Sequence, residues 1–249
     1  ASRPDAIYTI VCDIRSEEQV DNLVDETIAK FKRLDFLVNN AGGQFRAPAA
    51  SIKLKGWEAV MRTNLTGTFL VTKKAYHAWM KKNGGSIVNI VLVMNNGHPL
   101  LAHSAAARAG IENLSKSLSV EWASSGITIN CVAPVRALQC STSIYSMDSN
   151  LLTLYYYAPI TVQGVILSSG VDNYEGGASL FVTSAEKVTT AKRVGTVEET
   201  AAGVIFYLTP AAQYITGTTM FVDGGWHLMG SLVDVPKHSS NKPYGNAKL

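Results

Sequence analysis

The spacing of apolar residues changes between two periods along the chain. Short runs rich in aliphatic and β-branched residues, typical of strands buried on both faces, lie at 8–12, 35–42, 86–94, 126–134 and 219–222. Between these runs, apolar residues recur every three or four positions, which indicates helices with one buried face over 16–31, 57–82, 104–124 and 197–208. Regular alternation of strand and helix predicts an α/β fold, a Rossmann-like doubly wound parallel sheet.

Local signals mark two of the expected boundaries. Ser16-Glu17-Glu18-Gln19 predicts a capping box at the start of the first helix, with acidic residues in its first turn. Gly84-Gly85 predicts the end of the long helical region that precedes the third strand. No internal repeat is visible, and we expect one domain over 1–249.

The composition narrows the class of protein. With 249 residues, 47% hydrophobic and 16% charged, the chain is long enough for one α/β core, and no stretch approaches the roughly 18 apolar residues of a membrane span. The net charge of +3 comes from scattered lysines and arginines. This argues against nucleic acid as the main partner and is compatible with an anionic ligand, such as a phosphorylated cofactor or a coenzyme A ester. The three cysteines and five histidines lack metal-ligand spacing, so no metal site is expected.

Seven stretches resemble the short-chain dehydrogenase/reductase family and follow one another in its order. They are NNAG (39–42), NLTGTF (64–69), GSIVNI (85–90), ARAG with KSLSVEWA (107–110 and 116–123), INCVAP (129–134), RVGTVEE (193–199) and ITGTTMFVDGG (215–225). The phrases NNAGGQF, KGWEAV and HSAAARAG resemble in particular the branch that reduces trans-2-enoyl-CoA esters in peroxisomes. This resemblance implies NADPH as cofactor, an acyl-CoA substrate and a homo-oligomer.

The resemblance also implies which residues contact the cofactor. Asp13 and Ile14 would contact the adenine, and the backbone at Asn39, Ala41 and Gly42 would approach the adenosine ribose. The nicotinamide carboxamide would be positioned by the family's strand–Pro-Gly run, which this chain carries in two pieces, Pro134 and then Gly164 with Ile166. NADPH rather than NADH rests on the resemblance alone.

The catalytic positions depart from the family's Ser, Tyr and Lys. The ungapped register places Ser104 at the tyrosine position and Arg108 at the lysine position, while Val91-Leu92 replaces the serine. A serine hydroxyl is too weak an acid to replace a phenol with a pKa of about 10. A second frame, Glu112 before Lys116, is more simply a surface ion pair at i,i+4.

Reduction of an enoyl thioester makes a smaller demand than reduction of a ketone, because the enolate needs charge stabilisation rather than protonation of an alkoxide. We therefore expect Arg108, the hydroxyl of Ser104 and a water held by Asn64 to stabilise the enolate. His103 is either a proton donor or an ordinary loop histidine before the helix. An alcohol dehydrogenase or ketone reductase, and a non-catalytic protein of the same fold, remain the alternatives.

Two features depart from the family's full-length pattern. The family's opening strand, glycine-rich turn and helix, which cradle the pyrophosphate, would precede residue 1, and we expect the chain to lack them. Gly176-Gly177 and Gly224-Gly225 do not follow a strand and open a helix as that turn requires. The chain is then either truncated or unable to hold the dinucleotide.

The second departure is the segment 135–163, which interrupts the run INCVAP–GVILSSG and is longer than ordinary loops. We interpret it as a structureless insertion, either a translated, unspliced intron or a lid over the acyl pocket. A flexible tail is expected from about 230 to 249. Its end, Ala247-Lys248-Leu249, is similar to a peroxisomal address, which predicts a peroxisomal import receptor as partner and a peroxisomal location.

Overall fold

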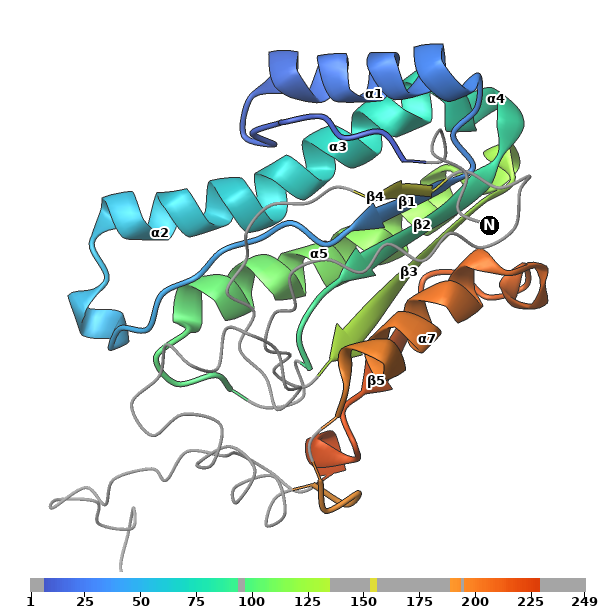
Figure 1. Ribbon diagram of the computed structural model, residues 1–249. Coiled ribbons are helices and arrows are strands. Elements are labelled where there is room, and N and C mark those ends of the chain that lie inside the picture. Colours follow the sequence, from blue (N-terminus) through green and yellow to red (C-terminus); the bar gives the residue numbers. More distant parts are fainter. Residues whose placement is uncertain (1–6, 94–96, 135–152, 156–188, 194, 229–249) are drawn as a thin grey trace, which may run out of the picture.

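In the computed structural model, the described chain comprises residues 7–93, 97–134, 153–155, 189–193 and 195–228 (Figure 1). Five strands form one sheet of order β4-β1-β2-β3-β5, in which every neighbouring pair is parallel. The strands are β1 (Phe36–Asn39), β2 (Gly85–Ile90), β3 (Ile127–Pro134), β4 (Thr153–Tyr155) and β5 (Thr219–Val222). The predicted α/β class with a parallel sheet is confirmed, and the carboxyl ends of the strands share one edge.

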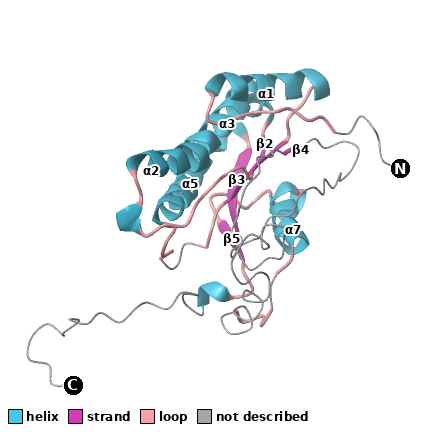
Figure 2. Ribbon diagram, turned by 60° about the vertical axis from the view of Figure 1, so that its left-hand side comes forward, coloured by secondary structure: helices cyan, strands magenta, loops and turns pink. Residues whose placement is uncertain are grey.

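Helices cover both faces of the sheet (Figure 2), with α1, α2, α3 and α5 on one side and α7 on the other. The described α-helices are α1 (Glu17–Phe31), α2 (Leu54–Met61), α3 (Gly67–Ala75), α4 (Lys81–Asn83), α5 (Ala102–Glu121) and α7 (Val197–Leu208). The π-helical turns η3 (Arg62–Thr66) and η4 (Tyr76–Met80) join α2, α3 and α4 into one continuous helical segment. Short 3₁₀ turns are η2 (Ala49–Ser51), η5 (Ala123–Ser125), η7 (Pro210–Ala212) and η8 (Trp226–Leu228).

The core lies on both faces of the central strands. Alternate residues enter one cluster with α1, α3 and α5, namely Leu37, Ile87 and Ile129. The opposite face forms a second cluster with α7 from Val38, Val88, Val132 and Val204. The continuous apolar runs therefore reflect burial on both sides of a parallel sheet.

Several predicted boundaries are confirmed. The helical segment from Leu54 to Asn83 ends at Gly84, whose φ of 72° is readily adopted by glycine. At α1, Ser16 Oγ accepts a hydrogen bond from the backbone N–H of Gln19, but the Gln19 side chain accepts from the N–H of Asp13. The predicted capping box is thus only half formed.

Two strand predictions are wrong in part. Residues 8–12 lie outside the sheet: Ile10 and Cys12 pack against the core, but Val11 is 96% exposed and the segment has no ladder with a described strand. The strand predicted over 86–94 ends at Ile90, although Val91 and Val93 stay buried. Apolar residues indicate burial, whereas a strand also needs a backbone partner.

The edge of β1 is paired with part of the segment expected to be a structureless insertion. Thr153, Leu154 and Tyr155 pair in parallel with Phe36, Leu37 and Val38. The prediction for 135–163 is therefore wrong at these three residues. The rest of that segment and the tail from 230 lie outside the described residues, so the intron, the lid and the peroxisomal address stay predictions.

A buried chain of hydrogen bonds ties the two central strands to α5. Asn39 Nδ2 donates to Asn89 Oδ1 at 2.7 Å and to Thr72 Oγ1 at 2.9 Å. Asn89 Nδ2 donates in turn to Ser115 Oγ at 2.9 Å, and Ser115 donates to the carbonyl of Ile111. Because each group has a partner, this polar network stabilises the register of β1 on β2.

Replacement of Asn89 by leucine should destabilise the fold. Asn89→Leu leaves one buried Asn39 N–H without its acceptor, and a buried unpaired group costs about 1–3 kcal/mol. Ser115 Oγ loses the Asn89 donor but keeps its bonds to Ile111 and Cys131. We expect the free energy of unfolding in urea to fall by about 1–3 kcal/mol. The exposed Asn113→Leu on α5 is the control, with an expected change within about 0.5 kcal/mol. Equal effects would show that the network carries no stability.

Candidate functional site

The start of α5 reaches the carboxyl edge of the sheet. A turn closed by the Leu101 N–H and the His98 carbonyl, with Leu100 at φ 68°, directs the chain into this helix. A left-handed leucine is uncommon and carries backbone strain, which is often found near functional sites. Ser104 and Arg108 are both buried and lie four residues apart on the same face of α5.

Arg108 is a buried cation at this edge. Its residue is 5% exposed, and Nη1 donates to the carbonyl of Ile90, the last residue of β2. Burial lowers the pKa of the guanidinium to about 10. Among the described residues, no carboxylate forms an ion pair with Arg108. An unpaired buried charge is costly, so the site favours an anionic oxygen beside the guanidinium.

Gly42 packs directly against Arg108, and the Asn64 side chain lies next to Gly42. A Cβ on Gly42 would lie 2.1 Å from Arg108 Nη2 and 2.6 Å from Asn64 Oδ1, so only glycine fits without displacement. Asn64 is fully buried in η3, and its amide both donates to the carbonyl and accepts from the N–H of Gly43. The helix around Asn64 is a π-helical turn. Its water relay stays a prediction, because the side-chain amide is occupied by Gly43.

Ser104 is bonded to a residue that sequence reasoning missed. Its hydroxyl donates to Gln44 Oε1 at 2.6 Å, and the Nε2 of Gln44 is buried with no partner among the described residues. Gln44 belongs to NNAGGQF, just beyond the carboxyl end of β1. A polar residue at that position in a parallel sheet is a signal that could have identified it.

His103 is buried next to this group. Its Nδ1 accepts from the Ser104 N–H at 2.9 Å, and its ring meets Phe45 edge-on with centroids 4.3 Å apart. Burial lowers the pKa of the imidazole, so the ring is neutral near pH 7. Nε2 is buried and has no hydrogen-bond partner among the described residues. At neutral pH, His103 is a neutral hydrogen-bond donor rather than an imidazolium acid.

The residues predicted to contact the adenine have local partners. Arg15 donates from Nε and Nη2 to the Asp13 carboxylate, and these hydrogen bonds lower the pKa of Asp13 to about 2. Ile14 is buried against α3, where a Cβ on Gly67 would lie 2.5 Å from its Cδ1. The adenine contact of Asp13 and Ile14 stays a prediction.

The other residues predicted to contact the cofactor differ in their surroundings, and two of them lie outside the described residues. The Asn39 amide is used in the buried network, Ala41 belongs to the core, and Pro134 ends β3 beside Val222. These residues lie at or just beyond the carboxyl edge, as the predicted backbone approach requires. Gly164 and Ile166 lie outside the described residues, as do Gly176-Gly177.

The glycine pair after β5 does not have the surroundings of a phosphate-binding turn. Gly224-Gly225 follow β5 but precede the 3₁₀ turn η8 within the described residues, not an α-helix, as the sequence predicts. The N–H groups of Gly225 and His227 donate to the Asp223 carboxylate at 3.0 and 2.8 Å. This side chain occupies donors that a phosphate would need, so the turn is no pyrophosphate cradle.

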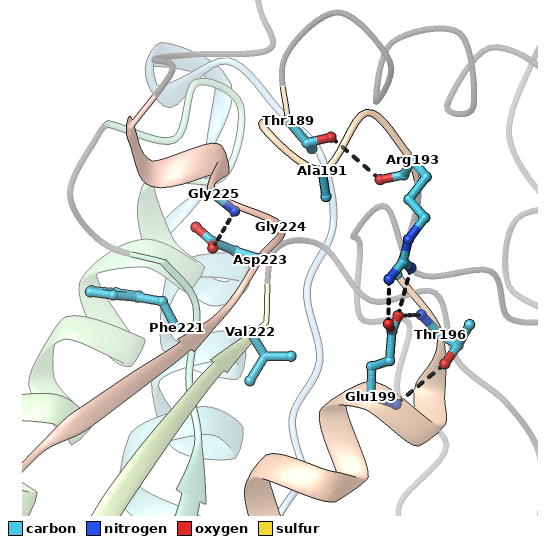
Figure 3. Close-up of a pocket in the computed structure, with 11 residues that line it drawn as sticks. Thr189, Ala191, Arg193, Thr196, Glu199, Phe221, Val222, Asp223, Gly224 and Gly225 are labelled. Carbon is cyan, nitrogen blue, oxygen red and sulfur yellow. Dashed lines mark hydrogen bonds and ion pairs between the residues drawn. The ribbon is translucent and has the colours of Figure 1, made fainter.

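A cavity of about 270 Å³ lies between that turn and the start of α7 (Figure 3). Arg193 donates to both carboxylate oxygens of Glu199, which also accepts from the N–H of Thr196. The Arg193 guanidinium, through these hydrogen bonds, lowers the pKa of Glu199 to about 2. None of the predicted catalytic residues lines this cavity, and its Arg and Glu neutralise each other, so we place the candidate chemistry at Arg108.

Lys116 and Glu112 form the surface ion pair predicted from their i,i+4 spacing, with Lys116 Nζ 3.4 Å from the Glu112 carboxylate. The described helices include none with the length and apolar content of a membrane span. Within the same residues, no cluster of three metal-ligating side chains is found.

Comparison with known proteins identifies the family. Residues 2–139 match the family described as short chain dehydrogenase, and residues 161–227 match the family described as Enoyl-(Acyl carrier protein) reductase. The chain belongs to the short-chain dehydrogenase/reductase family, as its sequence motifs predict. Residues 140–160, within the interruption expected over 135–163, fall in neither match.

Individual relatives differ in their named substrates. The chain is 33% identical to a peroxisomal 2,4-dienoyl-CoA reductase of Danio rerio, over 87% of this chain and 63% of the relative. It is 34% identical to a 3-oxoacyl-[acyl-carrier-protein] reductase of Synechocystis, over 87% of this chain and 74% of the relative. The structure of a citronellol catabolism dehydrogenase from Pseudomonas aeruginosa is similar with a TM-score of 0.66 and 36% identity, covering 88% of this chain and 72% of that one. The chain thus spans less than two thirds of the Danio rerio protein.

A matched glycine pair tests the close packing at Arg108. Gly42→Ala places a Cβ against Arg108 and Asn64, whereas Gly43→Ala meets no atom within 4 Å. We expect Gly42→Ala to lower the free energy of unfolding by about 1–3 kcal/mol, the usual cost of overpacking, and Gly43→Ala to change it little. Thermal and urea denaturation measure both. Similar losses in the two variants would contradict the arrangement.

The pH dependence of stability tests the burial of His103. Because its pKa is lowered in the folded state, the unfolded chain binds the proton first as the pH falls below about 6.5. Its contribution to stability is therefore complete above that pH and is lost as acid reaches the folded pKa. We expect the urea midpoint to fall more between pH 7.5 and pH 5.5 in the wild-type chain than in His103→Gln. Parallel pH profiles would contradict this.

Proposed function

We propose that the chain is part of an enzyme that reduces the double bond of trans-2-enoyl-CoA esters with NADPH in peroxisomes. The observation that carries this proposal is the buried Arg108, which lacks a carboxylate partner among the described residues and lies at the carboxyl edge of the sheet. One named relative supports the same class of chemistry, since the Danio rerio protein is a peroxisomal 2,4-dienoyl-CoA reductase.

The reaction adds a hydride to the β-carbon of the enoyl thioester, and the electrons of the double bond move toward the carbonyl oxygen. NADPH, when bound, supplies that hydride. The resulting enolate oxygen is the atom that Arg108 stabilises, because a cation held in a buried site acts strongly on developing charge. A proton added to the α-carbon then completes the saturated acyl-CoA.

Ketone reduction fits the site less well, although one relative is a 3-oxoacyl reductase. An alkoxide must be protonated as it forms, and this requires an acid near the substrate. The Ser104 hydroxyl donates to Gln44, and His103 is neutral near pH 7. The enolate needs charge stabilisation at its oxygen, which Arg108 offers, and its α-carbon takes the second hydrogen as a proton from water in a later step.

A 2,4-dienoyl-CoA ester is a second candidate substrate, favoured by the names of the relatives. Hydride addition at its far double-bond carbon also sends charge to the thioester oxygen. The same guanidinium would serve both substrates, so the choice between them depends on the length and shape of the acyl site rather than on Arg108.

The described residues fit a dinucleotide only in part. Gly42 allows close approach of the β1 turn to Arg108, and Pro134 ends β3 at the same edge. Within the described residues, no strand leads through a glycine-rich turn with free N–H groups into a helix, so no pyrophosphate contact is assigned. We also propose that Asp13 and Ile14 contact the adenine and that the cofactor is NADPH rather than NADH. The protein is further proposed to form a homo-oligomer and to be imported into peroxisomes through Ala247-Lys248-Leu249.

Loss of NADPH absorbance with crotonyl-CoA tests the function. We expect Arg108→Met to lower kcat/KM by about a hundredfold or more, as for removal of an oxyanion donor. The urea midpoint of unfolding should not fall in this variant, because the substitution removes a buried charge that lacks a carboxylate partner in the described chain. Arg108→Lys should retain part of the activity through its charge.

The alternatives give different results in the same assay. Reduction of acetoacetyl-CoA without reduction of crotonyl-CoA or 2,4-hexadienoyl-CoA would identify a ketone reductase. Failure to bind NADPH or any acyl-CoA would identify a non-catalytic protein of this fold.

A further inference from the structure

We infer that the outer edge of β1 is a strand-pairing surface, which β4 covers within one chain and a second copy of this chain occupies once β4 has left. β4 is then a detachable cover, and its departure allows two copies to associate. The inference rests on backbone pairing in the sheet. It does not depend on the proposed function, because neither cofactor nor substrate takes part in it.

The sheet is continuous without β4. Among the described strands, β4 lies at the end of the sheet and pairs with β1 alone (Figure 1). β2 lies between β1 and β3, and β3 also pairs with β5. α7 leads through η7 to β5 and packs on β2, β3 and β5. The departure of β4 therefore breaks no other described ladder.

β4 is also an addition to the pattern of the family. Its residues, Thr153–Tyr155, lie within 140–160, which neither family match covers. The strand has three residues, whereas strands of globular proteins usually have about five or six. A short strand makes few ladder hydrogen bonds, so it leaves the edge more readily than a longer strand would.

The direction of the backbone groups shows which atoms of β1 the cover protects. The Ser86 N–H donates to the Asp35 carbonyl at 3.0 Å, so the backbone of Asp35 faces β2. Successive residues of a strand turn their backbone groups to opposite sides. The N–H and C=O groups of Phe36 and Val38 therefore face the outer edge.

Leu154 is the residue of β4 that faces these groups. It stands in register with Leu37, and so between Phe36 and Val38 along the edge. In a parallel ladder, a residue in this place donates to the carbonyl before its partner and accepts from the N–H after it. The N–H of Thr153, one residue earlier, points away from β1.

An uncovered β1 edge fits a second copy of itself. A sheet edge with unpaired N–H and C=O groups is a template for another strand. β1 reads Phe-Leu-Val-Asn, without the charged or proline residues that oppose pairing at an edge. Two copies related by a two-fold axis present the same edge to each other, and their β1 strands then run antiparallel. Such a contact closes on itself, so each edge takes one partner.

Two proline variants of β4 test the inference. Leu154→Pro removes the N–H that faces β1, whereas Thr153→Pro removes an N–H that points outward and is the matched control. Size-exclusion chromatography with light scattering measures the mass. We expect the mean mass of Leu154→Pro to be about twice that of the wild-type chain at the same concentration, and Thr153→Pro to keep the wild-type mass.

Hydrogen exchange of single amides locates the association. In dilute Leu154→Pro, the Val38 amide should exchange about tenfold faster than in the wild-type chain, or more, because its acceptor has left. The Leu37 amide, which faces β2, should keep the wild-type rate and so shows that the sheet is folded. At high concentration the Val38 amide should regain protection, since β1 of the second copy supplies an acceptor.

The inference is overturned if Leu154→Pro keeps the wild-type mass while its Val38 amide is open, because the free edge then takes no second copy. A doubled mass with the Val38 amide still open would place the association on another face. Unchanged Val38 exchange, or equal association of both proline variants, would show that β4 is not the specific cover of this edge. Fast exchange at Leu37 as well would show that the sheet cannot do without β4, which is then not detachable.

Discussion

The burial of one guanidinium, which has no carboxylate partner in the described part of the chain, governs the organisation of the site. Arg108 extends from α5 to the end of β2, where the Ile90 carbonyl accepts one of its hydrogen bonds. A cation removed from water is tolerated only where dipoles and hydrogen bonds replace its hydration. The carboxyl edge of a parallel sheet offers such carbonyls, and Gly42 leaves the space that the guanidinium occupies.

Two polar systems lie near each other but differ in how they are satisfied. In the core, Asn39 is hydrogen-bonded to Asn89, and Asn89 is hydrogen-bonded to Ser115. These bonds link β1, β2 and α5. At the edge, Gln44 and His103 each keep a buried nitrogen that has no partner in the described chain. Complete pairing stabilises the fold, whereas incomplete pairing beside a cation indicates where a ligand oxygen would lie.

Sequence patterns predicted burial better than strand pairing. The central strands and α7 were found where the apolar periods placed them, because both faces of a parallel sheet must be covered. The segment 8–12 is also apolar, yet its backbone has no ladder, while Thr153–Tyr155 forms one with β1. Pairing depends on which backbone edges meet, and an apolar pattern carries no information about that partner.

The family, the parallel α/β class and the one-turn spacing of Ser104 and Arg108 can be read from the sequence, because they follow from motifs and periods within short stretches. The contacts of those two side chains are visible only in the folded chain. Ser104 is hydrogen-bonded to Gln44, 60 residues away, and the Arg108 guanidinium packs against Gly42, which lies beside Asn64 from a third segment. Contacts of that kind depend on how distant elements pack at the sheet edge, which local spacing along the chain does not specify.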